Sequence, residues 1–370
     1  MAEETAKPPS GIVSVLGRAP LAMIVLSVVG IVLTAVLKLA GADDVVVFVA
    51  SAATLAVMAG LVGEGTDHLG SHFGPGTTGV LQSALGNLPE LFISIFALQE
   101  GLVVLTQTSL IGSILGNSLL VLGLAFFAGG LKHGRQVFDA APVRTIAITL
   151  VLAVAALAIP TVSTAPGGPD RGHAVEISVF VSIVLLIVFV ASIPFSLAGG
   201  QGASVIGPTK EHPWPLRVAL VVLAAAAAGS ALIAEWFVDA LQPTMAALGL
   251  SEAFVGLVVV ALAGNAVEHV VGIQQAVKGR TDLAISLIQN SSLQVALALI
   301  PVIMLASLFI SPVPMTLVLT PTLLVGLTLS ALLGAFVVFD GESTWLEGLM
   351  LLGLYAIIAA SVWYGPAITI

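Results

Sequence analysis

Long apolar runs divide almost the whole chain, and they leave few ways for it to fold. A helix needs about 20 mostly apolar residues to cross the hydrocarbon core of a bilayer. Only 8% of the residues are charged, whereas soluble domains carry about 25%. We therefore expect an all-α integral membrane protein with eleven transmembrane helices. The expected spans are 20–40, 45–63, 79–99, 103–129, 143–161, 175–198, 215–240, 252–277, 283–310, 314–337 and 345–366.

The basic residues indicate how these spans are oriented. Lys and Arg close to transmembrane segments tend to stay on the cytoplasmic side. With a cytoplasmic N-terminus, the inner segments hold nine of the eleven basic residues and the outer loops hold only Lys38 and Arg171. The sequence therefore predicts the N-terminus in the cytoplasm and the C-terminus outside.

Charge and motifs argue against several functional classes. The net charge of −9 is unfavourable for nucleic acid, which requires basic patches. The chain has no Cys, hence no thiolate metal site and no thiol catalysis. Its sequence has no P-loop, zinc-protease motif or Gly-x-Ser-x-Gly motif. We expect neither an enzyme nor a prosthetic group, and cations are the more natural partners.

Two polar motifs interrupt the apolar sequence 178 residues apart: GNLPE at Gly86–Glu90 and GNAVE at Gly264–Glu268. The same offset matches Ser113 with Ser291. These matches carry weight because polar residues inside spans are rare and costly. The motif-bearing spans are five apart, so the second copy should cross the membrane in the opposite sense. Inverted repeats are typical of secondary transporters.

The repeat predicts five regions along the chain. They are a polar N-terminal tail (1–19), an extra transmembrane helix (20–40), a first five-helix repeat (45–198), a linker (199–214) and a second, inverted five-helix repeat (215–370).

The repeated motifs bring oxygen ligands into the membrane interior. Asn87 and Glu90 are three residues apart, so a continuous helix would put them on one face. Carboxylates, carboxamides and hydroxyls suit Ca²⁺, which accepts 6–8 oxygen ligands, better than Mg²⁺, which demands strict octahedral geometry. The expected ion-site residues are Glu90, Glu268, Asn87, Asn265, Gly86, Gly264, Ser113, Ser291 and Gln294.

The two glutamates suggest why the site would exchange ions. A buried carboxylate without a partner takes up a proton, whereas a dication between two carboxylates lets both stay ionised. Ca²⁺ and protons would then compete for one site, and this competition is the basis of antiport. A structural role for each glutamate as a paired buried acid is the alternative.

Other polar residues are candidates for proton relays or for the mouths of the ion path. His269 follows Glu268, and imidazole titrates near neutrality, although neighbouring side chains on a helix point in different directions. Glu64 lies in the predicted inner loop between spans 2 and 3, and Glu235 lies near the outer end of span 7. Further candidates in spans 4 and 9 are Asn117, Asn290 and Ser292.

These motifs resemble the cation/proton (Ca²⁺/H⁺) exchanger family of the calcium/cation antiporter superfamily, over nearly the whole chain from the first span. The resemblance is strongest at Gly86–Glu90, Ser109–Gly130, Leu250–His269, Ser291–Leu297 and Asp340–Gly348. It implies an eleven-span fold with one extra helix and two inverted halves. It also implies Ca²⁺/H⁺ exchange, with Glu90 and Glu268 as carriers of Ca²⁺ and protons.

The chain departs from this family at two places. The family usually shows Gly-Ser-Ser-Leu-Gln in span 9, where this chain has Asn290 in place of the Gly. Eukaryotic members often carry an acidic segment between the halves, whereas the linker here holds one acid, Glu211. The short linker and tails favour a prokaryotic protein of the inner (plasma) membrane.

Two related functions are alternatives on the same fold: monovalent cation (Na⁺ or K⁺)/H⁺ antiport and Na⁺-coupled Ca²⁺ exchange. A channel is a third alternative, from another class. The expected partners are Ca²⁺ and H⁺ as substrates and the lipid bilayer, without nucleic acid, and a homo-oligomer is compatible with the sequence.

Overall fold

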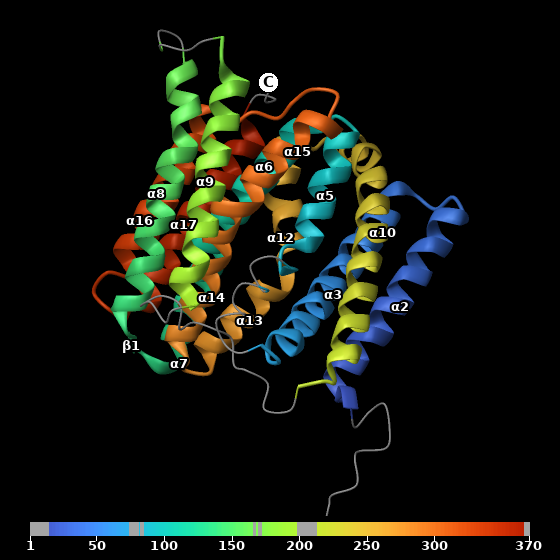
Figure 1. Cartoon of the computed structure of the whole chain (residues 1–370), viewed down its shortest axis with the longest axis horizontal. Helices are drawn as coiled ribbons and strands as arrows, with labels where there is room; N and C mark the ends of the chain where they lie inside the picture. The colour runs from blue at the N-terminus through green and yellow to red at the C-terminus, as the bar shows by residue number, and fades with distance from the viewer. Residues whose placement is uncertain are drawn as a thin grey trace, which may run out of the picture.

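The computed structural model of the chain describes residues 15–73, 81, 85–165, 168, 172–197 and 213–365. The described part is a bundle of helices (Figure 1), with one short strand pair, β1 (Gln136–Val137) and β2 (Glu342–Ser343), running antiparallel. Most of the predicted N-terminal tail and linker lies outside the described residues, and so does Arg171 of the predicted outer loop between spans 5 and 6.

Eight helical segments in the described part are long and apolar enough to cross a membrane. They are α2 (Arg18–Leu39), α3 (Asp44–Gly70), the run Val103–His133, α8 (Ala140–Thr164), α9 (Ala174–Leu197), α10 (Leu216–Leu248), the run Thr281–Ile310 and α17 (Trp345–Tyr364). The run Val103–His133 comprises α6 (Val103–Leu115), the π-helix η1 (Gly116–Val121) and α7 (Leu122–His133). The run Thr281–Ile310 comprises α14 (Thr281–Gln294), the π-helix η3 (Val295–Leu299) and α15 (Ile300–Ile310).

Three further segments complete the bundle. One is bent by 66°: α11 (Glu252–Phe254), the π-helix η2 (Val255–Val260) and α12 (Ala261–Gly264) precede the bend, and α13 (Ala266–Val277) follows it. The others are the shorter apolar helices α5 (Leu88–Gln99) and α16 (Pro321–Val337). All of these segments fall within or across predicted spans. The all-α, multi-pass membrane class is confirmed, while eleven complete crossings, inverted repeats and the orientation of the termini stay predictions.

Helix boundaries recur at the same 178-residue offset as the polar motifs. The matched pairs are α5 with α13, α6 with α14 and α7 with α15, and the members of each pair begin 178 residues apart. The π-helices η1 and η3 begin within one residue of the same offset. Gly101 and Gly279, also 178 apart, turn the chain with φ values of 75° and 76°, a conformation that favours glycine. The two copies therefore share their local structure.

The structure corrects two predicted boundaries. α3 continues to Gly70, through residues expected to form an inner loop, so Glu64 lies on a helix. Its Oε1 lies 3.3 Å from Nε2 of His68, one turn later, and this pair supports the added turns. The span expected from 314 becomes helical only at Pro321, because Thr320 caps α16 and proline suits a first helical turn.

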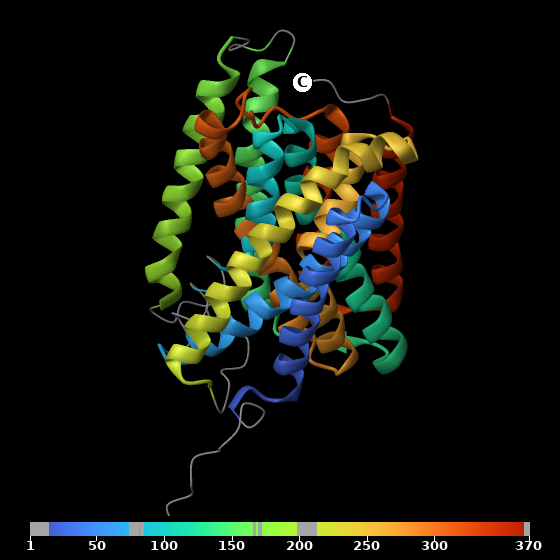
Figure 2. The same ribbon diagram turned by 90° about the vertical axis from the view of Figure 1, so that its right-hand side faces the viewer.

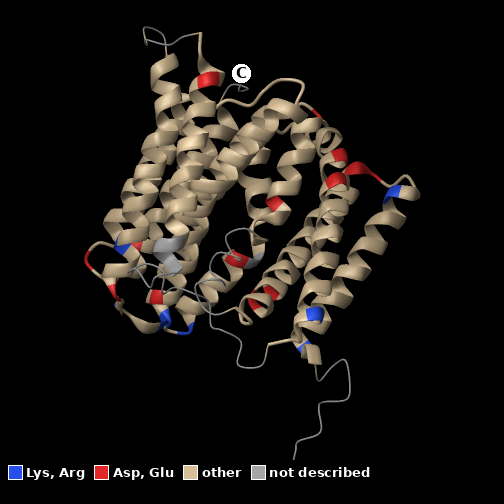
Figure 3. Cartoon of the chain, viewed as in Figure 1, with Lys and Arg blue, Asp and Glu red and all other residues tan. Residues whose placement is uncertain are grey.

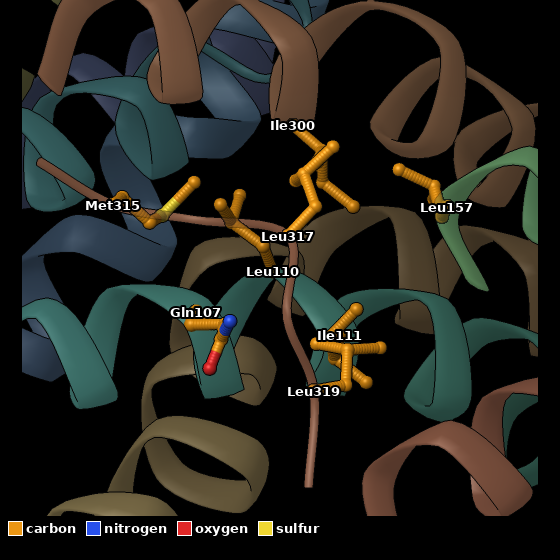
Figure 4. Close-up of a pocket in the computed structure, with 8 residues that line it drawn as sticks. All are labelled: Gln107, Leu110, Ile111, Leu157, Ile300, Met315, Leu317 and Leu319. Atoms are coloured by element: carbon orange, nitrogen blue, oxygen red, sulfur yellow. The ribbon is translucent and has the colours of Figure 1, made fainter. Parts of the chain in front are cut away.

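The non-helical segment before α16 is held by side chains. Gln107 of α6 donates to the carbonyl oxygens of Thr316 and Val318, at 2.9 and 2.8 Å. The non-helical segment and α6 line a pocket of about 10 Å³, whose other lining side chains are mostly apolar (Figure 4). This is roughly the space of one water molecule, and none of the predicted ion-site residues lines it.

Two groups of helices place the site. One large apolar core contains residues of α6, α7, α8 and α9 together with residues of α14, α15, α16 and α17. A second core contains residues of α3, α5, α10 and η2. α3 and α10 contact each other more extensively than any other two elements, and α10 is tilted across the bundle (Figure 2).

Lys and Arg gather mainly at one end of the bundle (Figure 3), where Lys132 at the end of α7 donates to the Val277 carbonyl. This end corresponds to the predicted cytoplasmic side.

Candidate functional site: a paired-carboxylate cation site

Both polar motifs break a helix immediately before their glutamate. Asn87 precedes α5 with φ −89° and ψ 16°, and Asn265 precedes α13 with φ −111° and ψ 14°. Pro89 lies in the first turn of α5, where its missing N–H costs nothing. The expectation that Asn87 and Glu90 share one continuous helix face is therefore wrong, because Gly86 and Asn87 form a turn. Each glutamate instead lies in the first turn of a new helix.

Glu90 is enclosed by groups from both halves of the chain. Its side chain is 1% exposed, and Oε1 accepts a hydrogen bond from the Ser113 hydroxyl of α6. Gly264, at the end of α12, packs against it, since a Cβ added at Gly264 would lie 3.5 Å from the Glu90 Cβ. Figure 1 shows α5 and α12 side by side in the middle of the bundle.

Glu268 has a similar partner but a more open environment. Its Oε2 accepts from the Ser291 hydroxyl of α14 at 3.0 Å, and its side chain is partly exposed. Ser113 follows Glu90 by 23 residues, and Ser291 follows Glu268 by 23 residues. Glu268 follows Gly264, which packs against Glu90, by only four residues, so the two glutamates lie near the same helix break.

Each of these serines is held by a carboxamide from the other half. Asn265 donates to the Ser113 hydroxyl at 2.9 Å, and Asn117 donates to the Ser291 hydroxyl at 3.0 Å. Two chains of hydrogen bonds result, from Asn265 through Ser113 to Glu90 and from Asn117 through Ser291 to Glu268. The position of each carboxylate thus depends on both halves of the molecule.

Two oxygens of this group lack hydrogen-bond partners among the described residues. They are Oε2 of Glu90 and Oδ1 of Asn87, both buried. Buried polar atoms are normally paired, and a bound ion is one explanation for an unpaired one. The donor set is oxygen-rich, as a hard cation requires. In the described part of the chain, no three His, Cys, Asp or Glu side chains gather as a metal site.

The other predicted residues of spans 8 and 9 lie on the same helices as Glu268 and Ser291. Ser292 is buried, and its hydroxyl lies 3.1 Å from that of Ser118 on η1. Asn290 and Gln294 are partly exposed on α14. His269 is buried next to Glu268, and its Nε2 has no partner among the described residues, so a relay role stays a prediction.

At both predicted mouths, side chains near the candidate acids have partners that the sequence did not reveal. At the cytoplasmic end, the ring of His68 stacks on Trp214 with centroids 3.9 Å apart, and the Trp214 backbone N–H donates to His68 Nδ1 at 3.0 Å. At the outer end, Glu235 is exposed on α10, and Asp239 one turn later pairs with Lys38 at 2.5 Å. Part of the outer acidic charge is therefore neutralised.

Sequence reasoning also missed Ser118 and Trp214. The 174-residue spacing of the Ser118–Ser292 contact differs from the repeat offset, so the internal comparison did not pair these serines. An aromatic residue at the end of a linker carries no signal of its own. Their roles depend on which helices meet.

Comparison with known proteins identifies the family. A sequence model of the sodium/calcium exchanger protein family matches residues 44–198 and 218–364. The chain belongs to this family. The Ca²⁺/H⁺ antiporter ChaA of Bacillus subtilis is 36% identical over 342 residues, which cover 90% of this chain and 97% of ChaA. The Ca²⁺/H⁺ antiporter of Synechocystis is 32% identical over 348 residues, covering 89% of this chain and 93% of that protein.

Solved structures agree with this assignment. Native YfkE aligns with a TM-score of 0.79 and 34% identity, covering 92% of this chain and 99% of YfkE. The H⁺/Ca²⁺ exchanger CAX aligns with a TM-score of 0.69 over 93% of this chain and 91% of CAX, at 18% identity, which shows the shared fold. This exchanger-family chain is thus a transporter rather than an enzyme.

Proposed function

We propose that this protein is a secondary active antiporter that exports Ca²⁺ from the cytoplasm in exchange for protons. The observation that carries the proposal is the pair Glu90 and Glu268, each at a helix break and each bound by a serine hydroxyl. The relatives ChaA and YfkE are named Ca²⁺/H⁺ antiporters, which supports the choice of ions. A prokaryotic inner membrane is the location that fits these relatives.

Competition at the two carboxylates supplies the coupling. With Ca²⁺ between them, both carboxylates stay ionised, and their charges balance the ion. Without Ca²⁺, two unpaired charges in a low-dielectric site are costly, so protons bind instead. The serine hydroxyls suit both states, because a hydroxyl donates to an ionised carboxylate and accepts from a protonated one.

Alternating access would then open the site, with either Ca²⁺ or protons bound, first to one side of the membrane and then to the other. The recurring helix boundaries support two related halves, as in secondary transporters. From the cytoplasm Ca²⁺ displaces protons, and from outside protons displace Ca²⁺. Two protons per Ca²⁺ would make the cycle electroneutral. With three, one net charge would enter per cycle, and the membrane potential would contribute about 2.3 kcal/mol per 100 mV.

The remaining predicted residues receive supporting roles in this proposal. Asn87, Asn265, Gly86, Gly264 and Gln294 complete the ion site. Asn117, Asn290, Ser292 and His269 pass protons or line the path, while Glu64 and Glu235 gather cations at the inner and outer mouths.

The test uses purified protein in liposomes with an imposed pH gradient. Ca²⁺ uptake and lumenal pH are followed together for the native chain, Glu90→Gln and Glu268→Gln. Glu176→Gln, which removes an exposed carboxylate at the start of α9, is the matched control. We expect coupled Ca²⁺ and proton flux in the native chain and the control, and loss of both fluxes in the two site variants.

Other outcomes would redirect the proposal. Ca²⁺ flux driven by a Na⁺ gradient without a pH gradient would identify Na⁺-coupled exchange, the activity named by the family. Proton flux answered by Na⁺ or K⁺, but not by Ca²⁺, would retain the mechanism and change the ion. Ca²⁺ flux without proton movement would refute competition between the two ions.

A further inference from the structure

A close contact between two helices closes one side of the site. Gly112 of α6 lies against η2, so a Cβ added there would lie 2.7 Å from the Leu257 Cα. Gly256 of η2 lies against α6, so a Cβ added there would lie 2.6 Å from the Leu105 carbonyl oxygen. Non-bonded atoms do not approach so closely. Each helix therefore meets the other where a side chain is missing, as small residues permit.

This contact lies between the glutamates and the predicted outer end. Gly112 directly precedes Ser113, the hydrogen-bond donor to Glu90. From Gly112, α6 runs back to its start at Val103, close to the turn at Gly101, at the end of the bundle away from Lys132. Almost every residue of α6 is buried, which leaves no open route to Glu90 along this helix.

The opposite side of the site is more open. Glu268 is partly exposed, in contrast to Glu90. One face of α14 carries partly exposed residues at helical spacing from the level of Glu268 toward the cytoplasmic end. These are Gln294, Asn290, Leu287 and Leu283. The residues around Glu90 are thus buried toward the outer end, whereas residues along this face of α14 are partly exposed.

The internal repeat does not reproduce the glycine contact. At the 178-residue offset, Gly112 corresponds to Asn290 and Gly256 corresponds to Thr78 in the sequence. A carboxamide and a β-branched residue stand where the outer contact has two glycines. Of these two related positions, only the one on the outer side therefore has a glycine on both helices.

We propose that the Gly112–Gly256 contact is the outer gate of the ion path and that it sets the resting state, with the outer end closed and the cytoplasmic end accessible. The proposal rests on alternating access, but not on the identity of the ion. A methyl group on either glycine clashes only while α6 and η2 touch, so it disfavours the closed state alone. The population then shifts toward the state with an open outer end.

Thiol labelling tests this gate, because the chain contains no Cys. Ser94 lies one turn after Glu90 on α5, on the outer side, and its buried hydroxyl has no partner among the described residues. Ser94→Cys is nearly isosteric and places a thiol there. A membrane-impermeant methanethiosulfonate reagent is applied to the outer face of right-side-out vesicles.

We expect slow labelling in Ser94→Cys alone, and labelling about tenfold faster or more when Gly112→Ala or Gly256→Ala is added. Gly116→Ala is the matched control, since it also lies in the α6–η1 run and a Cβ added there meets nothing within 4 Å. It should leave the labelling rate unchanged. Because the two glycines lie on different helices, one variant can still test the gate if the other misfolds. Gel filtration verifies that each variant is folded.

Equal labelling rates in all variants would overturn the proposal. So would equal acceleration by Gly116→Ala, which would indicate general loosening of the bundle. Ca²⁺ and proton fluxes are measured separately on vesicles of the native chain. A failure of coupled flux there would refute the proposed function and leave the labelling result, and thus the gate, to be judged independently.

Discussion

Removing the Ser113 hydroxyl should shift the pH dependence of Ca²⁺ transport to higher pH. In Ser113→Ala, the ionised Glu90 loses its hydrogen-bond donor, while the protonated form loses less. A hydrogen bond to a charged group contributes about 1.5–3 kcal/mol. One pH unit corresponds to about 1.4 kcal/mol, so the midpoint of Ca²⁺ uptake should rise by about one to two pH units. The sign follows because the hydroxyl favours the ionised carboxylate, which is the form proposed to bind Ca²⁺.

The same substitution on the other side should have a smaller effect. Ser291→Ala removes the 3.0 Å donor to Glu268, but Glu268 is partly exposed and water can replace the hydroxyl. Ser118→Ala is the control, because among the described residues the Ser118 hydroxyl pairs, at 3.1 Å, with the hydroxyl of Ser292 and not with a carboxylate. It should leave the midpoint unchanged.

The assay is initial Ca²⁺ uptake into proteoliposomes, with the pH of the Ca²⁺-binding side varied at a constant pH difference across the membrane. The expected order of midpoints is Ser113→Ala above Ser291→Ala above the native chain and Ser118→Ala. A midpoint for Ser113→Ala equal to that of the native chain would refute the view that this hydroxyl sets the balance between Ca²⁺ and protons at Glu90.

Three further substitutions test the stability of the bundle by thermal unfolding in detergent. Trp214→Ala should lower the free energy of unfolding by about 3–5 kcal/mol, because Trp214 is 1% exposed and stacks on His68; an unchanged melting temperature would refute the anchoring of this segment. Gln107→Ala leaves two carbonyl oxygens without their donor, at about 1–3 kcal/mol each, and a loss below about 1 kcal/mol would show that water replaces the amide. Lys38→Ala breaks an ion pair with Asp239 whose side chains are 39% and 46% exposed, so the loss should stay below about 1 kcal/mol, and a larger one would reveal a second role for Lys38.

The sequence predicted those features that depend on local properties. The length of an apolar run is independent of its neighbours, so the membrane class and the position of each helical segment could be read directly. The break at each glutamate was partly visible too. Gly86 and Pro89 are both signals of a helix start, although the continuous face expected for Asn87 and Glu90 overlooked them.

Features that depend on which helices meet could not be predicted. The contact of Asn117 with Ser291 joins residues 174 positions apart, and its spacing differs from the repeat offset. The added turns of α3 depend on the pairing of Glu64 with His68 and on Trp214. The π-helices carry no motif, and the neutralisation of Asp239 by Lys38 requires α2 and α10 to lie together.

The crossed hydrogen bonds explain how two half-sites could act as one. Ser113 is held by Asn265 and Ser291 by Asn117, so movement of one half against the other disturbs the donors of both carboxylates. An ionised carboxylate that loses its donor inside the membrane, with no cation present, is strongly disfavoured. The movement is therefore inexpensive only when Ca²⁺ balances the two charges or when protons remove them. In the proposed mechanism, this condition would keep the empty, charged site from changing the side of the membrane to which it opens, and it would couple the export of Ca²⁺ to the entry of protons.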